Sequence, residues 1–238
     1  MKIALIGYGK LGKTIENLGL KQGHSFPLII DLNNSQDLNP QNVKGIDVAI
    51  EFSAPLAAPG NIIKCLELGI PVVSGTTGWN KRFEEINQFC LSRNGAFFYA
   101  SNFSIGVNIL FLMNRQLARI MDKFPQYKVS MEEVHHIHKL DAPSGTGITL
   151  AEGLLEELGN SKRWTLEESK DPADIHISAI REGEVKGKHT VSYDSNLDSI
   201  SLSHNAKSRE AFAEGALLAA EFISKRKGIF GMNDLLEF

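Results

Sequence analysis

Residues 1–12 read MKIALIGYGKLG, and this stretch decides the fold. Ile3 to Ile6 form a continuous apolar run, which is typical of a strand buried on both faces of a parallel sheet. The run leads into Gly7–Gly12, a G-x-G-x-x-G turn that opens a helical pattern. Such glycines allow a tight turn and let a pyrophosphate rest on the helix N-terminus. The stretch predicts a dinucleotide-binding strand–turn–helix, with a plain strand-to-helix turn as the alternative.

The next strand supports this interpretation because it ends in an acid. Ser25–Ile30 is apolar enough for a second buried strand, and Asp31 follows it, 19 residues after Gly12. An acid at about this spacing binds the ribose hydroxyls of a dinucleotide. None of the three residues in Leu32–Asn34 is the cation that a 2′-phosphate would need, and Asp31 would repel that phosphate. We therefore expect NADH to be preferred, with NADPH as the alternative.

Strands and helices go on alternating up to about residue 104. Further strands are predicted at Ile46–Phe52, Pro71–Val73 and Ala96–Tyr99. The alternation predicts an α/β fold with a doubly wound parallel Rossmann sheet. Ligands of such sheets bind beyond the carboxyl ends of the strands. We expect a cofactor cleft at four such ends, which are Gly7–Gly12, Phe52–Ser53, Gly75–Thr77 and Ala100–Phe103.

The pattern changes after residue 104. A long helix is predicted at 105–124 and a strand at Tyr127–Val134, with a last helix at Ala211–Ile223. Three more strands are predicted between them, and Arg181–Glu184 is predicted to be a hairpin turn. This order predicts a second, α+β domain with a mixed or antiparallel sheet. We place the dinucleotide-binding domain at 1–104 and 208–238, and the second domain at 105–207.

Most of the candidate chemistry lies in Glu132–Gly147, which reads EEVHHIHKLDAPSGTG between a predicted strand and a predicted helix. If the strand continues through the histidines, His135 and Lys139 share one of its faces. A histidine beside a lysine can donate a proton near neutral pH, since each positive charge lowers the pKa of the other group. The unpaired amides at the helix start suit an anion, and Ser144 or Thr146 can cap the helix.

Three interpretations of this run stay open on the residues alone. The histidines at 135, 136 and 138 can belong to a solvated surface strand, to a metal site or to a catalytic centre. The helix start at Pro143–Thr146 favours catalysis, because a structural cap needs no flanking histidine and lysine.

Composition sets limits on compartment and partners. The 238 residues are 42% hydrophobic and 22% charged, with a net charge of −3, which is ordinary for a globular protein and lacks the basic surplus of nucleic-acid binders. Cys65 and Cys90 lie in apolar, helix-like contexts and are predicted to be buried free thiols in a reducing compartment. No apolar run fits a signal peptide or a membrane span. We expect a cytoplasmic protein without nucleic-acid or membrane partners.

Several segments together resemble the bacterial dihydrodipicolinate reductase family, whose members are also called 4-hydroxy-tetrahydrodipicolinate reductases. The central motif is E-x-H-H-x-x-K-x-D-A-P-S-G-T at Glu133–Thr146, and it is highly specific. The other matching segments follow in order along nearly the whole chain and are Gly7–Gly12, Gly75–Gly78, Ser101–Val107, Ile180–Glu184, Gly187–Thr190, His204–Arg209 and Gly228–Met232.

The resemblance implies roles for individual residues. His135 corresponds to the family's proton donor/acceptor, and Lys139 to its proton-donating lysine. Substrate contacts are expected at His136, Ser144, Gly145 and Thr146. Cofactor contacts are expected at Gly7, Tyr8, Gly9, Lys10, Leu11, Gly12, Asp31, Gly75, Thr76, Thr77, Ala100, Ser101, Asn102 and Phe103. The family's pattern also implies a homotetramer built through the sheet of the second domain, which binds the substrate.

This chain departs from the family's pattern at the glycine turn, which is one residue shorter than the G-x-x-G-x-x-G of many members. The shorter turn can shift the pyrophosphate contacts by a residue. The whole chain is also shorter than usual, and no arginine follows Asp31 where some members use one for NADPH.

The expected function is NAD(P)H-dependent reduction of 4-hydroxy-tetrahydrodipicolinate to tetrahydrodipicolinate in diaminopimelate and lysine biosynthesis, with protonation by His135 and Lys139. One alternative is another two-domain nicotinamide-dependent dehydrogenase with a different substrate. A second is a nicotinamide-sensing module without turnover. A metal is not expected.

Overall fold

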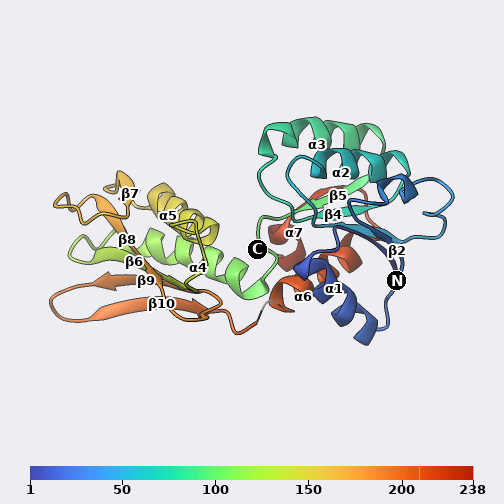
Figure 1. The fold of residues 1–238 in the computed structure, drawn as a ribbon. Helices are drawn as coiled ribbons and strands as arrows, with labels where there is room; N and C mark the ends of the chain where they lie inside the picture. Colours follow the sequence, from blue (N-terminus) through green and yellow to red (C-terminus); the bar gives the residue numbers. More distant parts are fainter. Residues whose placement is uncertain (209, 238) are drawn as a thin grey trace. The chain divides into compact units, whose positions relative to one another are not determined.

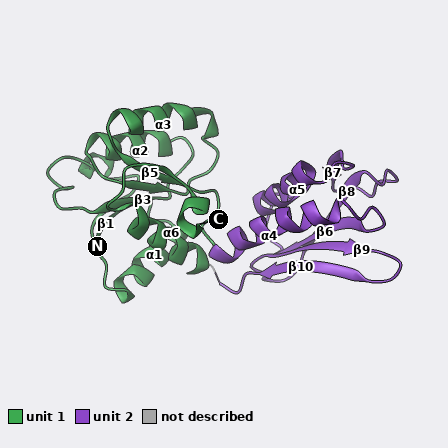
Figure 2. Cartoon of the chain, turned by 180° about the vertical axis from the view of Figure 1, so that it is seen from behind, with its two compact units in different colours: residues 1–104, 209–238 green, residues 105–208 purple. Residues whose placement is uncertain are grey.

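The structure, a computed structural model, describes residues 1–208 and 210–237. It divides into two compact units, Met1–Ser104 with Arg209–Phe238, and Ile105–Ser208 (Figure 2). Two residues lie outside the described residues. They are Arg209, the last residue of the matching segment His204–Arg209, and Phe238, the last residue of the predicted dinucleotide-binding domain.

The first unit is built on a six-stranded sheet in the order β11-β5-β4-β3-β1-β2. Every strand pair in it is parallel, so the predicted doubly wound parallel sheet is confirmed. The strands are β1 (Lys2–Ile6), β2 (Ser25–Ile30), β3 (Val48–Glu51), β4 (Val72–Ser74), β5 (Ala96–Tyr99) and β11 (Gly228–Phe230).

Strand β1 shows why this sheet needs helices on both faces. Ile3 and Leu5 point into one core and Ala4 and Ile6 into the other, and all four are buried. Successive side chains of a strand alternate between its faces, so an all-apolar strand needs two apolar covers. The covers are α1 (Lys10–Lys21) and α6 (Glu210–Ile223) on one face, and α2 (Ala58–Glu67) and α3 (Phe83–Ser92) on the other (Figure 1).

Short elements complete the first unit. Strand β11 pairs with β5 along three residues, and α7 (Met232–Leu236) follows it. The sequence analysis missed both, because three to five residues are too few for a periodic pattern. Two single-turn 3-10 helices, η1 (Ser35–Asp37) and η2 (Asn80–Arg82), lie in loops. The two cysteines are buried and free, as predicted.

The second unit places two helices on one face of a five-stranded mixed sheet in the order β10-β9-β6-β8-β7. Strand β6 pairs in parallel with β8 and antiparallel with β9, so the α+β prediction is confirmed. The helices are α4 (Ile105–Met121) and α5 (Gly145–Glu157), and the strands are β6 (Lys128–His135), β7 (Arg163–Thr165), β8 (Asp174–Arg181), β9 (Lys188–Asp194) and β10 (Ser199–Asn205).

The predicted hairpin at Arg181–Glu184 is wrong. Strands β8 and β9 follow one another along the chain, but they lie on opposite sides of β6 and do not pair. The intervening turn crosses the end of β6, where the Glu182 amide donates to the His135 carbonyl oxygen at 2.8 Å. This crossing brings residues from both neighbours to the carboxyl end of β6.

Among the described residues, we find no helix with the length and apolar content needed to cross a bilayer.

Gly215→Ala should destabilise the first unit, because α6 passes directly against the backbone of Phe103. An added Cβ would lie 1.8 Å from the Phe103 carbonyl oxygen, so the backbone must move. Overpacking of this kind costs about 1–3 kcal/mol. Urea unfolding measures the change in the free energy of unfolding.

Gly60→Ala in α2 is the matched control. Among the described atoms, none lies within 4 Å of a Cβ built at Gly60. The better helix propensity of alanine should therefore stabilise this variant by about 0.5–1 kcal/mol. Equal free energies of unfolding for the two variants would contradict the packing assigned to α6.

Candidate active site

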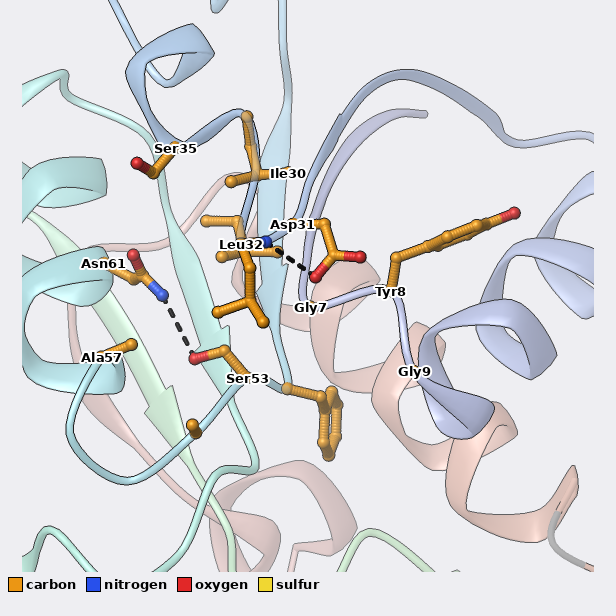
Figure 3. A pocket seen from close by; sticks show the side chains of 13 residues that line it. Gly7, Tyr8, Gly9, Ile30, Asp31, Leu32, Ser35, Ser53, Ala57 and Asn61 are labelled. Atoms are coloured by element: carbon orange, nitrogen blue, oxygen red, sulfur yellow. Dashed lines mark hydrogen bonds between the residues drawn. The ribbon is translucent and has the colours of Figure 1, made fainter.

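A cavity of about 450 Å³ opens beside the glycine turn of the first unit. Gly7, Tyr8 and Gly9 line it on one side, and Asp31 and Ser53 line it from the ends of neighbouring strands (Figure 3). An adjoining hollow of about 360 Å³ shares part of this lining and extends it to Lys10, Leu11, Gly12, Gly75, Thr76 and Thr77. The structure therefore brings together the glycine turn, the acid after β2 and the turn after β4.

The glycine turn fits a bound pyrophosphate in its backbone. Gly7 has a φ of +96°, and a Cβ there would lie 2.1 Å from the Phe52 carbonyl oxygen. A Cβ at Gly12 would lie 2.3 Å from the Gly7 carbonyl oxygen. By contrast, a Cβ built at Gly9 would meet none of the described atoms within 4 Å, and Gly9 is the N-cap of α1. Backbone amides at an open helix start are a favourable place for phosphate groups.

Asp31 lies at the edge of the larger cavity. Its carboxylate accepts a hydrogen bond from the Leu32 amide at 2.8 Å (Figure 3). The amide of Asp31 donates to the Asn34 side-chain oxygen at 2.7 Å. Both bonds hold the loop after β2 in place and keep the carboxylate beside the cavity. This geometry fits ribose hydroxyls, which donate hydrogen bonds to carboxylates.

Ala100, Ser101, Asn102 and Phe103 line neither hollow. Phe103 is 2% exposed, and its ring packs against that of Phe52 with the centroids 5.4 Å apart. Its side chain therefore belongs to the core behind the glycine loop. A cofactor contact from these four residues stays a prediction.

Sequence reasoning missed Glu51, which is fully buried at the end of β3. Its carboxylate accepts hydrogen bonds from the Ser53 amide at 3.0 Å, the Ser74 hydroxyl at 2.6 Å and the Thr76 hydroxyl at 2.9 Å. One buried carboxylate thus joins the loops after β3 and β4 that line the smaller hollow. The sequence did offer a signal for Glu51, because it is an acidic residue within the otherwise apolar end of the predicted strand Ile46–Phe52.

In the second unit, β6 ends at His135 and does not continue through the histidines. The chain turns there, with the Lys139 amide donating to the His136 carbonyl oxygen at 3.1 Å. The expectation of a shared strand face for His135 and Lys139 is therefore wrong. The ring of His135 lies beside that of His189, and the exposed His138 contacts Glu184 at 3.4 Å.

Glu133 is the centre of a buried cluster at this strand end and is 1% exposed. It accepts hydrogen bonds from the Ser144 amide at 2.9 and 3.1 Å and from the Ser144 hydroxyl at 2.5 Å. Arg181 donates a third bond to it at 3.3 Å. Its two oxygens also face His135 at 3.7 Å and His189 at 3.8 Å. Four segments of the second unit therefore meet on one carboxylate.

Helix α5 begins at this cluster. Ser144 is its N-cap, and the Ser144 hydroxyl accepts a hydrogen bond from the Gly147 amide at 3.0 Å. A Cβ built at Gly145 would meet none of the described atoms within 4 Å, so a ligand can approach the backbone there. Thr146 follows in the first turn of the helix. This open helix start suits a carboxylate ligand.

Lys139 and Arg181 bring positive charge to the same strand end. The Lys139 ammonium contacts both oxygens of Asp141 at 2.8 Å. Arg181 donates to the Lys139 carbonyl oxygen at 3.3 Å and to the Asp141 carbonyl oxygen at 2.5 Å, besides its bond to Glu133. Arg181 therefore fixes the loop that carries Lys139. It lies in a segment that the sequence analysis matched without giving it a role.

The His135, His136 and His138 run does not form a three-histidine cluster. His136 lies beside His138, with their rings 6.0 Å apart, whereas His135 groups with Glu133 and His189, whose ligand atoms lie within 4.8 Å of one another. Both oxygens of Glu133 already accept hydrogen bonds, so the arrangement among the described residues suits a hydrogen-bonded cluster better than a metal ion.

The two buried imidazoles favour the neutral form. Burial lowers the pKa of His189 to about 4, with the neighbouring His135 as a second cause. Burial also lowers the pKa of His135, although the Glu133 carboxylate partly opposes this effect. A lowered pKa makes the protonated form of His135 a stronger acid, which suits a group that gives up a proton.

These features define a class, a two-domain dinucleotide-dependent oxidoreductase with a Rossmann unit and an α+β unit that carries acid–base groups. Two family models match this chain. The model of the dihydrodipicolinate reductase N-terminus matches residues 1–103, and the model of the dihydrodipicolinate reductase C-terminus matches residues 106–236. The chain belongs to the dihydrodipicolinate reductase family, which confirms the resemblance seen in the sequence.

Relatives support this membership along the full length. A 4-hydroxy-tetrahydrodipicolinate reductase of Christiangramia forsetii is 48% identical over 238 residues, which cover 99% of this chain and 98% of the relative. One of Methanopyrus kandleri is 39% identical over 83% of this chain and 74% of the relative. Among solved structures, a dipicolinate-bound dihydrodipicolinate reductase from Paenisporosarcina sp. TG-14 has a TM-score of 0.78 at 20% identity, covering 98% of this chain and 99% of that one.

The buried His189 makes the second unit sensitive to acid. Between pH 6.5 and about 4 the unfolded chain binds a proton at this residue and the folded chain does not. The free energy of unfolding should therefore fall as the pH drops through this window, by about 3 kcal/mol in full. Urea unfolding at several pH values measures the slope.

His189→Gln should flatten this dependence, because glutamine does not titrate. His138→Gln is the matched control, since His138 is exposed and its loss should leave the slope as it is. A His189→Gln protein with the unchanged pH dependence would refute the assignment.

Proposed function

We propose that this protein reduces 4-hydroxy-tetrahydrodipicolinate to tetrahydrodipicolinate with a nicotinamide cofactor, as a step of diaminopimelate and lysine biosynthesis. The observation that carries the proposal is the Glu133–Thr146 motif, in which Glu133, His135 and the start of α5 lie together at one strand end. Membership of the family over nearly the whole chain supports it independently.

Protonation is the task we assign to His135 and Lys139. The ring of the substrate gains one hydride and one proton, and its hydroxyl leaves as water. When bound, the nicotinamide supplies the hydride. Burial holds the pKa of His135 below its usual value, so the protonated ring is a readier proton donor than an ordinary imidazolium. Lys139 shares in delivering this one proton and, while it is protonated, contributes positive charge beside the substrate.

The substrate carries two carboxylates, and the second unit offers partners for both. Gly145 and Thr146 present backbone amides at the start of α5, and the open space at Gly145 supports a close approach. We assign further contacts to His136 and Lys139. For Ser144 we propose an indirect part, because its hydroxyl is already bonded to Glu133 and to the Gly147 amide.

His135→Gln should lower kcat on the order of 10²–10⁴-fold, because it removes a general acid. The assay follows NADH oxidation with the freshly made condensation product of aspartate semialdehyde and pyruvate. His138→Gln, the same change at an exposed position, is the control and should stay near the wild-type rate.

The same assay separates the other candidate functions. A wild-type protein that turns over a different substrate only would favour another two-domain dehydrogenase. A protein that binds NADH with no turnover of any imino acid would favour a sensing module.

For the cofactor we propose a preference for NADH. The Asp31 carboxylate at the edge of the cavity would repel a 2′-phosphate, and the following residues, Leu32–Asn34, bring no cation to offset this repulsion. The glycine turn, Gly75–Thr77 and Ser53 line the remainder of the proposed binding surface.

Asp31→Asn should raise kcat/KM for NADPH relative to NADH by about tenfold, because it removes a like-charge contact. Steady-state kinetics with both cofactors measure the ratio. Asp37→Asn, the same change at a half-buried residue of η1 that lines neither hollow, is the control and should leave the ratio unchanged. If the wild-type protein uses the two cofactors equally and Asp31→Asn alters nothing, the preference is refuted.

We further propose that the protein assembles as a homotetramer and works in the cytoplasm. The helix-free face of the second sheet supports the first proposal, because it carries a hollow lined by short polar side chains such as Ser130, Ser178, Thr190 and Ser192. The two buried free thiols support the second, since they fit a reducing compartment.

A further inference from the structure

Glu133 lies between two imidazoles, of which the proposed reaction uses one. Its Oε1 is 3.7 Å from Nδ1 of His135, and its Oε2 is 3.8 Å from Nε2 of His189. The two rings meet edge to face with their centroids 5.0 Å apart, and both are more than 90% buried. Two imidazolium ions at this separation would repel one another, so at most one of the two rings is favoured in the charged, imidazolium form.

The hydrogen bonds at Ser144 show where His189 carries a ring hydrogen. The single hydroxyl proton of Ser144 goes to Glu133, whose ionised carboxylate can only accept. The same oxygen accepts from the Gly147 amide at 3.0 Å and lies 3.1 Å from Nε2 of His189. Nε2 must therefore be the donor in this last contact, which places a hydrogen on Nε2 of His189. The other ring nitrogen, Nδ1, is buried and has no hydrogen-bond partner among the described residues, so a second hydrogen there would be left unsatisfied and the ring favours the neutral Nε2–H tautomer.

His135 has the opposite arrangement. Its Nδ1 is buried, faces the Glu133 carboxylate and has no hydrogen-bond partner among the described residues. Its Nε2 lies next to Gly187, where an added Cβ would be 3.2 Å away. Gly187 has a φ of +147°, so the close approach relies on glycine. One ring nitrogen thus meets the carboxylate while the other points to the Gly187 turn.

The other charged groups that face His135 do not replace Glu133. Lys139 and Arg181 are positive and oppose protonation of the ring, and Asp141 is negative but is engaged by Lys139. His189 comes from β9, and it adds a second ring that competes for the proton. Glu133 is therefore the main negative charge that can favour an imidazolium at His135.

We propose that Glu133 is a positioning residue that, through Ser144, holds His189 as a neutral Nε2–H imidazole and so directs the mobile proton of this cluster to His135. The use of this proton in catalysis rests on the proposed function. The assignment of the proton to His135 rests only on the geometry of the second unit. Glu133 and His189 need not touch the substrate.

Nitrogen-15 NMR of the ring nitrogens in the ligand-free protein tests the proposal directly. In the wild-type protein His189 should keep the neutral Nε2–H tautomer to a lower pH than His135 does, so that His135 becomes protonated first as the pH falls. Because this measurement needs no substitution, it stands even if a variant fails to fold. Protonation of His189 at a higher pH than His135, or an Nδ1–H tautomer at His189, would overturn the proposal.

Glu133→Gln removes the charge and keeps the shape. The pKa of His135 should fall by about one unit or more, because an opposite charge near a group favours its charged form. The limb of the kcat pH profile that reports this group should move to lower pH by the same amount. A purely structural role would lower activity without moving either quantity, and that result would refute the proposal.

Glu132→Gln is the matched control. It is compared with Glu133→Gln in preparations of the same oligomeric state. Glu132 is the preceding residue of β6, points to the other face and contacts Lys188 at 3.7 Å. It carries the same charge change and should shift the pKa of His135 by no more than about a few tenths of a unit. An equal shift in both variants would mean a general field effect and would also refute the assignment.

Failure of the proposed function gives a different pattern. If the wild-type protein has no reductase activity while the NMR titrations behave as described, the proton arrangement stands and the reaction assigned to it falls. If the wild-type protein is an active reductase and Glu133→Gln leaves the pKa of His135 unchanged, the reaction stands and the role of Glu133 falls.

Discussion

The second unit depends on one buried ion, the carboxylate of Glu133. A buried charge is tolerated only where hydrogen bonds and opposite charges compensate its lost hydration. Here the compensation comes from the N-terminus of α5 through Ser144 and from the end of β8 through Arg181. The same demand for partners therefore fixes the start of a helix, the end of a strand and the loop at Lys139–Asp141. The proposed acid–base chemistry and the folding of the second unit therefore share one set of contacts.

The first unit follows the same rule with different partners. Glu51 is fully buried at the end of β3 and is bonded by Ser53, Ser74 and Thr76. None of these groups is a cation, so hydroxyl and amide donors alone hold the carboxylate. In both units a buried acid at or near the end of a strand organises the loops beyond it. Those loops carry the predicted cofactor residues in one unit and the proposed acid–base residues in the other.

Local sequence patterns were sufficient for much of the fold. The apolar run at Ile3–Ile6 and the glycine turn after it identified the parallel sheet, because both signals lie within a dozen neighbouring residues. The motif at Glu133–Thr146 was specific enough to identify the family. What failed was pairing over distance. Strands β8 and β9 are consecutive in the sequence, and no local pattern shows that β6 lies between them. For the same reason Arg181 and His189, which reach Glu133 from these two strands, were matched without being given a role.

The first unit is discontinuous, since the chain leaves it after Ser104 and returns with α6 and β11. The core on one face of its sheet includes Ala216, Leu217 and Ala220 of α6, which pack with Ile3 and Leu5 of β1. On the ribosome, the glycine turn is therefore made early but cannot be locked in place until translation is almost over. The nascent chain must carry a sheet with one apolar face only partly covered, by α1 alone, through the synthesis of the whole second unit. Chaperones that shield such surfaces have most to do at that stage.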